Sequence, residues 1–333
     1  MLYMKFLVSI IIPCRNEEKF IGKCLDSIIA QDYPKENLEI LVVDGMSQDR
    51  TRKILKEYQN KYSFIKVLNN PKKIVPIALN IGIAQSRGEY ILRADAHSKY
   101  SFDYISKCVQ YLKKSKADCV GGTLNTLPSR DDFVAKGIAI ILSHPFGAGG
   151  RTFRTKRGEG YVDTVPFGAY KRKIFDKIGL FNKKLIRNQD IEFNSRIRKA
   201  SGKIFITPKI RLSYFAPPTF KKLFFQQFQN GLWNIYTQKI VPSSLSLRHF
   251  IPLFFALGLL GNLVFISFFF WAKILFILIL GSYILISLLI SFKISLKKDL
   301  RYLIILPFAF FILHFSYGLG SIWGLLTLWK IKK

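Results

Sequence analysis

Runs of apolar, β-branched residues alternate with helix-like stretches through the first hundred residues of the chain. The strand-like runs cover residues 6–13, 38–44, 64–68 and 90–94. The stretches between them carry apolar residues at helical spacing and cover 18–30, a helix that follows the turn at 45–49 and reaches 58, and 74–85. Uninterrupted apolar strands separated by helices are typical of a mostly parallel sheet covered on both faces. The pattern therefore predicts an α/β fold.

Polar residues gather where three of these strands end. Residues 13–17 follow the first strand, 44–45 end the second, and 95–97 follow the fourth. Ligands of open α/β sheets bind beyond the carboxyl ends of the strands. We therefore expect these three segments to converge on one rim of the sheet.

The region from about residue 117 to 218 is less regular. Two glycine-rich segments, 147–151 and 158–160, are expected to be flexible loops near a ligand, and 191–200 is expected to be a helix. Residues 220–236 then mix Phe, Leu, Trp and Tyr with Lys and Gln. This mixture suits either a helix that lies in a membrane interface or one that packs on a core, and its place before an apolar region favours the interface.

The last third of the chain is strongly apolar. Three segments, 250–271, 274–292 and 302–329, are long enough to span a bilayer at 1.5 Å per residue. A basic loop at 293–301 separates the second from the third, and the positive-inside rule places it in the cytoplasm. The third segment is followed by a basic tail that resists translocation, so it either crosses, re-enters or is split by Pro307 and its glycines. We expect a globular domain at 1–218, an interfacial helix and linker at 219–249, and a region of two to three spans at 250–333.

The charge of the chain restricts its partners. The sequence holds 51 Lys and Arg against 21 Asp and Glu. Such an excess suits nucleic acid, an anionic membrane surface or phosphate-bearing ligands, and the apolar C-terminal third favours the membrane. No nucleic-acid-binding module is recognisable, so no nucleic acid partner is expected. The short N-terminal apolar run lacks a cleavage site and leads into charged residues, which indicates a buried strand and a cytoplasmic domain.

The cysteines give no sign of a disulfide framework or a zinc site. The four, Cys14, Cys24, Cys108 and Cys119, form no CxxC pair and have no histidine at zinc-finger spacing. We expect them to be reduced and buried.

The first candidate for chemistry is Asp95-Ala96-His97. Alternate side chains of an extended backbone point the same way, so Asp95 and His97 can reach one ion. A carboxylate and an imidazole suit Mn²⁺ or Mg²⁺ bridging two phosphates. A surface Asp and His at a strand end is the alternative, and the position at the rim favours the metal site.

The second candidate is Asp190, with Gln189 and Glu192 beside it. A group transfer with inversion needs a carboxylate that takes the proton of the attacking hydroxyl. Asp190 and Glu192 also precede a helix, where the helix dipole favours negative charge, so capping without chemistry remains open. Gln189 could donate a hydrogen bond to a sugar hydroxyl in the same pocket.

Three further residues have candidate roles at a nucleotide. Asp44 ends a buried strand before a glycine, where its carboxylate can accept from a pyrimidine N–H or a ribose, or instead cap its own turn. Asn80 and Arg87 suit a turn that approaches a nucleotide, although a lone arginine is more often a solvated charge.

Taken in order along the chain, these segments resemble family 2 glycosyltransferases over roughly residues 6–215. The resemblance rests on residues 8–17, 41–51, 80–82 with 86–90, 95–97 in place of the usual DxD, 167–172 with 178–181, and 188–190 at the position of the ED motif. The C-terminal apolar region with 314–318 is similar to membrane-bound members that build exopolysaccharide repeat units.

This resemblance implies a GT-A nucleotide-diphosphosugar transferase fold followed by transmembrane helices. It assigns Asp95 and His97 to the metal and Asp190 to the base, and it assigns the nucleotide sugar to Pro13, Arg15, Glu17, Asp44, Asn80, Arg87 and Asp95. Residues Gly168, Gln189, Glu192 and Trp233 would face the acceptor or the sugar. Because His97 replaces the second carboxylate, the choice between Mn²⁺ and Mg²⁺ stays open. The QxxRW motif of processive enzymes lacks its arginine at 229–233, which favours the addition of one sugar.

We therefore expect an inverting, metal-dependent enzyme that moves a sugar from a nucleotide-diphosphate donor, with UDP the expected nucleotide, to a lipid-linked saccharide in exopolysaccharide or cell-surface glycan synthesis. It would be a multi-pass protein of the inner or plasma membrane. A close alternative is transfer onto polyprenyl phosphate itself, as in dolichol-phosphate-mannose synthases. An alternative of another class is a non-catalytic membrane scaffold that keeps a degenerate nucleotide-sugar fold.

Overall fold

The computed structural model describes residues 7–149, 152–155, 158–242 and 244–331. The chain forms two compact units. The first, which we call the sheet unit, contains residues 1–125 and 156–214, and the second, the helical unit, contains 126–155 and 215–333. This division differs from the predicted boundary at 218, because residues 126–155 group with the C-terminal helices.

The sheet unit is built on one mixed sheet with the strand order β3-β2-β1-β4-β8-β6-β9-β5, and β7 pairs with β9. The first four strands are parallel, as predicted, whereas the pairs β4–β8, β6–β8, β5–β9 and β7–β9 are antiparallel. Their bounds are β1 Val8–Cys14, β2 Leu38–Asp44, β3 Ile65–Asn69, β4 Tyr90–Arg93, β5 Ser98–Tyr100, β6 Cys119–Pro128, β7 Gly160–Tyr161, β8 Ala169–Lys171 and β9 Ile204–Ala216. The four predicted strands are therefore confirmed.

Helices cover this sheet. They are α1 Ile21–Ile29, η1 Lys35–Asn37, α2 Thr51–Lys61, α3 Val75–Gln85, α4 Tyr104–Lys114, α8 Lys173–Ile178 and α9 Gln189–Lys199. Strand β2 is buried at every position, which is expected of a parallel strand covered on both faces. Helix α3 packs closely on β1, since a Cβ added at Gly82 would meet the side chain of Ile11. The four cysteines are free and buried, as predicted.

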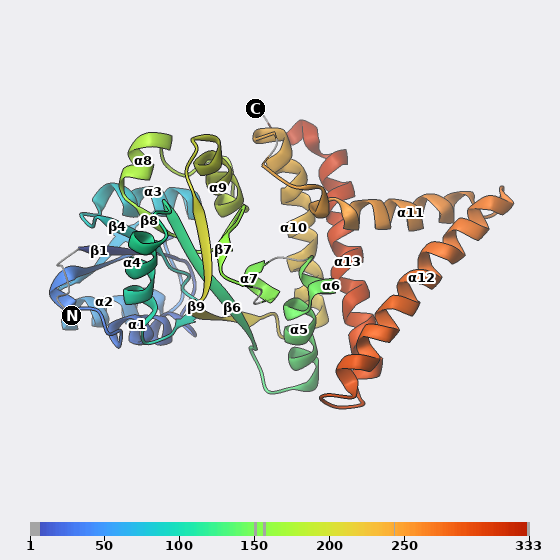
Figure 1. The fold of residues 1–333 in the computed structure, drawn as a ribbon, viewed down its shortest axis with the longest axis horizontal. Coiled ribbons are helices and arrows are strands. Elements are labelled where there is room, and N and C mark those ends of the chain that lie inside the picture. Colours follow the sequence, from blue (N-terminus) through green and yellow to red (C-terminus); the bar gives the residue numbers. More distant parts are fainter. Residues whose placement is uncertain (1–6, 150–151, 156–157, 243, 332–333) are drawn as a thin grey trace. The chain divides into compact units, whose positions relative to one another are not determined.

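The helical unit consists of α5 Phe133–Ser143, α6 Pro145–Ala148, α7 Thr152–Thr155, α10 Phe220–Ile240, η2 Leu247–His249, α11 Ile251–Phe265, α12 Phe270–Ser295, α13 Tyr302–Leu326 and η3 Leu328–Lys330 (Figure 1). Its core joins α5 to α10 and α13 through Ile138, Leu223 and Phe310. This apolar core explains why residues 126–155 belong here, since α5 buries its own apolar side chains against the C-terminal helices. In the predicted loop 147–151, Gly149 has a φ of +60°, and residues 150 and 151 lie outside the described part of the chain.

The apolar C-terminal segments differ from the prediction in one respect. Helices α12 and α13 have 26 and 25 residues and are long and apolar enough to cross a membrane. The segment predicted as a first span at 250–271 is instead the 15-residue helix α11, which ends at Phe265 before a turn. At 1.5 Å per residue α11 is about 22 Å long, less than the roughly 30 Å of a bilayer core, so this predicted span is wrong in extent.

Candidate functional site

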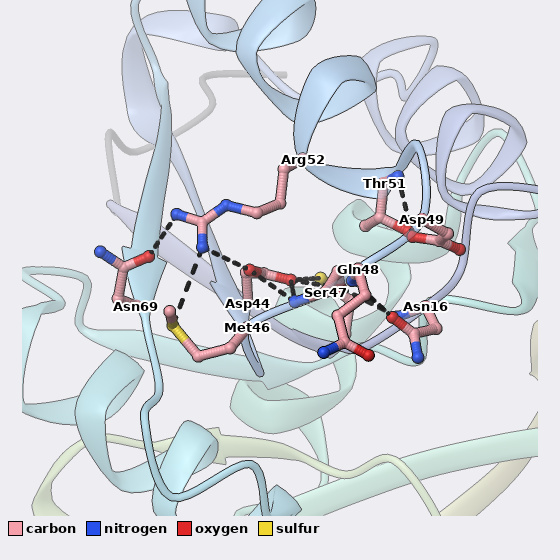
Figure 2. A network of polar contacts seen from close by, with 10 residues as sticks. Asn16, Asp44, Met46, Ser47, Gln48, Asp49, Thr51, Arg52 and Asn69 are labelled. Atoms are coloured by element: carbon pink, nitrogen blue, oxygen red, sulfur yellow. Dashed lines mark hydrogen bonds and ion pairs between the residues drawn. The ribbon is translucent and has the colours of Figure 1, made fainter.

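The loops that follow β1 and β2 are joined by hydrogen bonds at the carboxyl edge of the sheet (Figure 2). The Asn16 N–H donates to Ser47 Oγ at 2.8 Å, and the Gln48 N–H donates to Asn16 Oδ1 at 2.9 Å. The Glu17 N–H donates to Thr51 Oγ1 at 2.7 Å. These bonds fix the first two of the three segments that were predicted to meet at this edge.

The Asp44 carboxylate lies completely buried inside this network. Its Oδ1 accepts from Ser47 Oγ at 2.5 Å, and its Oδ2 lies 3.6 Å from Nη1 of Arg52. Nη2 of the same arginine donates to Asn69 Oδ1 at 2.9 Å. Asp44 thus caps its own turn, which was the alternative to nucleotide binding, and its contact with a nucleotide remains a prediction. The contact of Arg52 with Asp44 was not predicted from the sequence.

The acidic cluster after β4 brings together Glu17, Asp95 and His97. Nδ1 of His97 lies 2.9 Å from Asp95 Oδ1 and 3.3 Å from Glu17 Oε1. Burial alone would lower the pKa of His97, but the two carboxylates raise it to about 11. Burial alone would raise the pKa of Asp95, but the His97 cation lowers it. Glu17, which had been assigned to the nucleotide, therefore lies with the two predicted metal ligands.

The carboxylate and imidazole groups of this cluster are of the kinds that bind a divalent metal ion. Across the described ranges, no group of three His, Cys, Asp or Glu side chains has the arrangement of a complete metal cage. However, Mg²⁺ in nucleotide sites is commonly held by one or two carboxylates together with phosphate oxygens of the substrate. The adjacent carboxylate of Asp95 and imidazole of His97 would suffice for such a partial site, provided that His97 loses the proton it shares with Asp95.

Asp190 lies in the first turn of α9 and is held by two donors. Arg93 Nη1 lies 2.6 Å from Asp190 Oδ1, and the Phe167 N–H donates to Oδ2 at 3.3 Å. The side chains of Arg93 and Asp190 are only 11% and 17% exposed. Burial alone would lower the pKa of Arg93, but Asp190 raises it, so the arginine is a fixed cation. Arg93 is the last residue of β4, and this lone charge in an apolar strand could have been noticed in the sequence.

Other residues beside Asp190 have structural partners. Glu192 is buried and pairs with Arg196, with contacts of 2.6 and 3.0 Å to Nε and Nη2. Gln189 is also buried and donates to the carbonyl of Ile186. The carbonyl of Gly168 accepts the Arg93 N–H at 3.1 Å. The acceptor or sugar contacts expected of these three residues remain predictions.

Two residues that were expected to contact the nucleotide do not join this cluster. Asn80 exchanges two hydrogen bonds of 2.9 Å with the backbone of Phe181, which occupies both ends of its amide. Arg87 precedes β4 and lies at the amino edge of the sheet, opposite to the edge of Asp95, where its Nε is 3.5 Å from Glu39 Oε2.

The remaining predicted residues are less informative. Pro13 is the penultimate residue of β1. Arg15 is exposed, and its aliphatic stem lies near Gly45, where an added Cβ would be 3.2 Å from the Arg15 side chain. Trp233 belongs to α10 in the helical unit, where its ring packs edge-on against Tyr236.

Comparisons with known proteins identify the family and the fold. The sequence profile of glycosyl transferase family 2 matches residues 9–179. A Methanococcus voltae protein named dolichyl N-acetyl-alpha-D-glucosaminyl phosphate 3-beta-D-2,3-diacetamido-2,3-dideoxy-beta-D-glucuronosyltransferase is 31% identical over 330 residues, which cover 96% of this chain and 97% of that protein. The succinoglycan biosynthesis protein ExoA of Rhizobium meliloti is 27% identical over 249 residues, 73% of this chain and 74% of its own.

Two solved structures resemble the fold. The mannosyltransferase PcManGT from Pyrobaculum calidifontis, in complex with GDP-Man and Mn²⁺, matches with a TM-score of 0.59 at 17% identity and covers 96% of this chain and 88% of its own. TarS 1–349 of S. aureus matches with a TM-score of 0.54 at 17% identity, over 95% of this chain and 90% of its own. At this identity the likeness concerns the fold alone, and it confirms the predicted GT-A fold. The profile match and the 31% identical relative show more: the chain is a glycosyltransferase and belongs to glycosyl transferase family 2.

Proposed function

We propose that this glycosyltransferase moves one sugar, with inversion, from a nucleotide-diphosphate sugar to a lipid-linked saccharide at the cytoplasmic face of the inner or plasma membrane. The main support is the pairing of Arg93 with Asp190 at 2.6 Å. Arg93 stands two residues before Asp95, so one strand leads both to the candidate base and to the acidic cluster. A single displacement needs the base and the metal-binding cluster at the same edge of the sheet.

In the proposed reaction Asp190 acts as the general base. Its carboxylate takes the proton of the acceptor hydroxyl while the hydroxyl oxygen forms a bond to the anomeric carbon of the donor. The bond from that carbon to the diphosphate breaks, and the nucleoside diphosphate leaves with the electron pair. Arg93 and the Phe167 N–H keep the carboxylate oriented, since each holds one of its oxygens. One displacement at the anomeric carbon inverts its configuration.

Asp95 and His97 would hold a divalent cation, Mn²⁺ or Mg²⁺, which neutralises charge on the departing diphosphate. Glu17 lies 3.3 Å from His97 and orients its ring. Support from outside the chain comes from the mannosyltransferase of Pyrobaculum calidifontis, whose structure contains GDP-Man and Mn²⁺. The loop network around Asp44 would then border the nucleoside.

The lipid-linked acceptor is supported by two observations. The Methanococcus voltae relative is named for a dolichyl N-acetylglucosaminyl phosphate, a lipid-linked saccharide, and it aligns with nearly the whole chain. The helical unit also contains two helices of a length and composition that suit a membrane. The relative's name favours a saccharide on a lipid over polyprenyl phosphate alone as the acceptor, whereas the two helices suit either membrane lipid. Family membership favours catalysis over a non-catalytic scaffold.

The test is a screen of nucleotide sugars with extracted lipid-linked saccharides and, separately, with polyprenyl phosphate. We expect Asp190→Asn to abolish transfer and a chelator to suppress it until Mn²⁺ or Mg²⁺ is restored. Asp176→Asn, the same change at an exposed aspartate of α8, is the matched control and should leave transfer intact. Full transfer by Asp190→Asn would contradict the role of base, activity in chelator would contradict the metal role, and a product on polyprenyl phosphate alone would favour the alternative acceptor.

A further inference from the structure

Helices α10 and α13 of the helical unit run parallel to each other over most of their length (Figure 1). The ring of Phe220, at the start of α10, packs against Phe308 with 5.1 Å between centroids. Near the other end, Tyr236 and Thr327 share a hydrogen bond of 2.7 Å through their hydroxyl groups. Contacts therefore advance along both helices in the same direction.

Glycines bring the two backbones into direct contact. A Cβ added at Gly231 of α10 would meet the carbonyl oxygen of Tyr317, and one added at Gly320 of α13 would meet the carbonyl oxygen of Phe228. The side chain of Asn234 also donates to the hydroxyl of Tyr317. No lipid can lie between helices at this separation, so α10 must accompany α13 at whatever depth α13 has in a membrane.

Helix α10 is too polar for the hydrocarbon core of a bilayer. Its polar side chains include six amides and three lysines: Gln226, Gln227, Gln229, Asn230, Asn234, Gln238, Lys221, Lys222 and Lys239. The amides are spread through the middle of the helix, and in a bilayer core polar groups have no water to solvate them. Since α10 and α13 move together, a crossing by α13 would carry these amides across the bilayer.

The pair α11 and α12 has the opposite character. The turn between the two helices is among the most exposed apolar parts of the described chain, with Phe268 77% and Phe270 78% exposed and Trp271 beside them. Along α12 the buried residues are few and small, namely Ala272, Ser287, Ser291 and Ser295. The helices pack on each other through the stacked rings of Phe255 and Tyr283, at 4.5 Å. They form a hairpin whose outer surface suits lipid.

Basic residues gather at the open end of this hairpin, and one exposed lysine, Lys273, lies beside its turn. Arg248 precedes α11, and Lys293, Lys297 and Lys298 lie at the end of α12 or just beyond it. Lys330 follows α13. Anionic headgroups attract such residues, and the positive-inside rule keeps them on the cytoplasmic side.

We infer that the α11–α12 hairpin enters the bilayer turn first and returns to the same side, whereas α10 and α13 lie along the interface of that leaflet. The apolar face of α13, which includes the exposed Ile304, Phe308 and Trp323, then meets the acyl region. The protein is thus anchored from one side, and α13 does not cross. This inference rests on the membrane association in the proposed function but not on the identity of any sugar.

Cysteine labelling in membrane vesicles tests this arrangement. The four native cysteines are buried, so the wild-type chain serves as the blank. Single cysteines are placed at three exposed positions: Lys56→Cys in α2 reports the side of the sheet unit, Lys330→Cys reports the end of α13, and Phe268→Cys reports the hairpin turn. Right-side-out and inverted vesicles are treated with a membrane-impermeant maleimide, and each variant is first checked for transferase activity.

We expect Lys330→Cys to be labelled from the same side as Lys56→Cys, and Phe268→Cys to be labelled from neither side until detergent is added. Labelling of Lys330→Cys from the opposite side, or from neither, would show that α13 crosses or is immersed, and would overturn the inference. Labelling of Phe268→Cys from the side opposite to Lys56→Cys would mean that the hairpin spans the bilayer. Loss of the wild-type chain from alkali-washed membranes would instead contradict the membrane part of the proposed function.

Discussion

Replacing Arg93 by Gln tests whether this arginine acts through Asp190. The substitution removes the charge-assisted hydrogen bond of 2.6 Å and leaves the carboxylate with only the Phe167 N–H, at the longer distance of 3.3 Å. A bond between charged groups contributes about 1.5–3 kcal/mol, which corresponds to roughly 10- to 150-fold in rate if it is needed in the transition state. Because the remaining bond is weak, we expect a loss of about 100-fold in kcat.

The same substitution should also lower stability, since it leaves a mostly buried carboxylate without its cation. Breaking a buried pair costs about 3–5 kcal/mol, and the 17% exposure of Asp190 puts the expected loss near the lower limit, about 3 kcal/mol. Rates are therefore compared per folded enzyme, from kcat and KM with purified donor and acceptor. The KM for the donor should change little, because the Asp44 loops and Glu17 are untouched. Arg198→Gln, at an exposed arginine on the same helix as Asp190, is the matched control.

A double-mutant cycle shows whether Arg93 acts on catalysis through Asp190 or independently of it. If Arg93 acts through Asp190, adding Arg93→Gln to Asp190→Asn should cost less than about threefold more, because the interaction has already been lost. Additive effects in the cycle, or an Arg93→Gln enzyme within threefold of wild type, would refute the reasoning.

Three further substitutions test other parts of the structure. For Glu39→Gln we expect a loss of about 1–3 kcal/mol in unfolding free energy at pH 7, measured by circular dichroism, and a smaller further decrease in stability below pH 5 than in the wild type. Burial alone would raise the pKa of Glu39, but hydrogen bonds from the Arg87 N–H and from the Ser9 hydroxyl lower it. The stabilisation by the Glu39 carboxylate is therefore present above about pH 4.3 and is lost as the pH falls further. A flat pH dependence already in the wild type would contradict this. Asn80→Ala should lower the melting temperature without raising the KM for the donor, because its amide is occupied by the backbone of Phe181; a raised KM would instead support the predicted contact with the nucleotide. Gly231→Ala should separate α10 from α13 and reduce thermal stability, whereas Gly281→Ala, where an added Cβ meets nothing within 4 Å, should not; equal effects would argue against the close helix pair.

The sequence was sufficient for the parallel strands because their apolar runs are continuous and their ends carry polar residues. The meeting of Glu17, Asp95 and His97 follows from this, since parallel strands end at one edge. Arg87 shows the limit of the same argument. Its position before a strand rather than after it places it at the amino edge, and attention to that order would have separated it from the site.

Other features depend on contacts between distant segments and could not be predicted from local patterns. The pairing of Asn80 with Phe181, 101 residues away, leaves no periodic trace in the sequence. The grouping of residues 126–155 with the C-terminal helices likewise depends on what α5 packs against. The polar residues of α10 are visible in the sequence. Their consequence for the depth of α13 in a membrane is not, because it depends on the contact between Gly231 and the backbone of α13.

In the proposed reaction, the last residues of β4 and those just after it would hold the candidate base and the candidate metal ligand at a fixed spacing. The Ala94 N–H still donates to the Ile11 carbonyl at 2.9 Å, so the extended course continues past Arg93. Arg93 and Asp95 are alternate residues of this segment and face the same way, one toward Asp190 and the other toward His97. A single displacement fixes the distance between the attacking hydroxyl and the departing diphosphate, and a strand inside a sheet varies less than a loop. Attaching Arg93 and Asp95 to β4 and its extension would therefore transfer the rigidity of the sheet core to the groups of the proposed reaction.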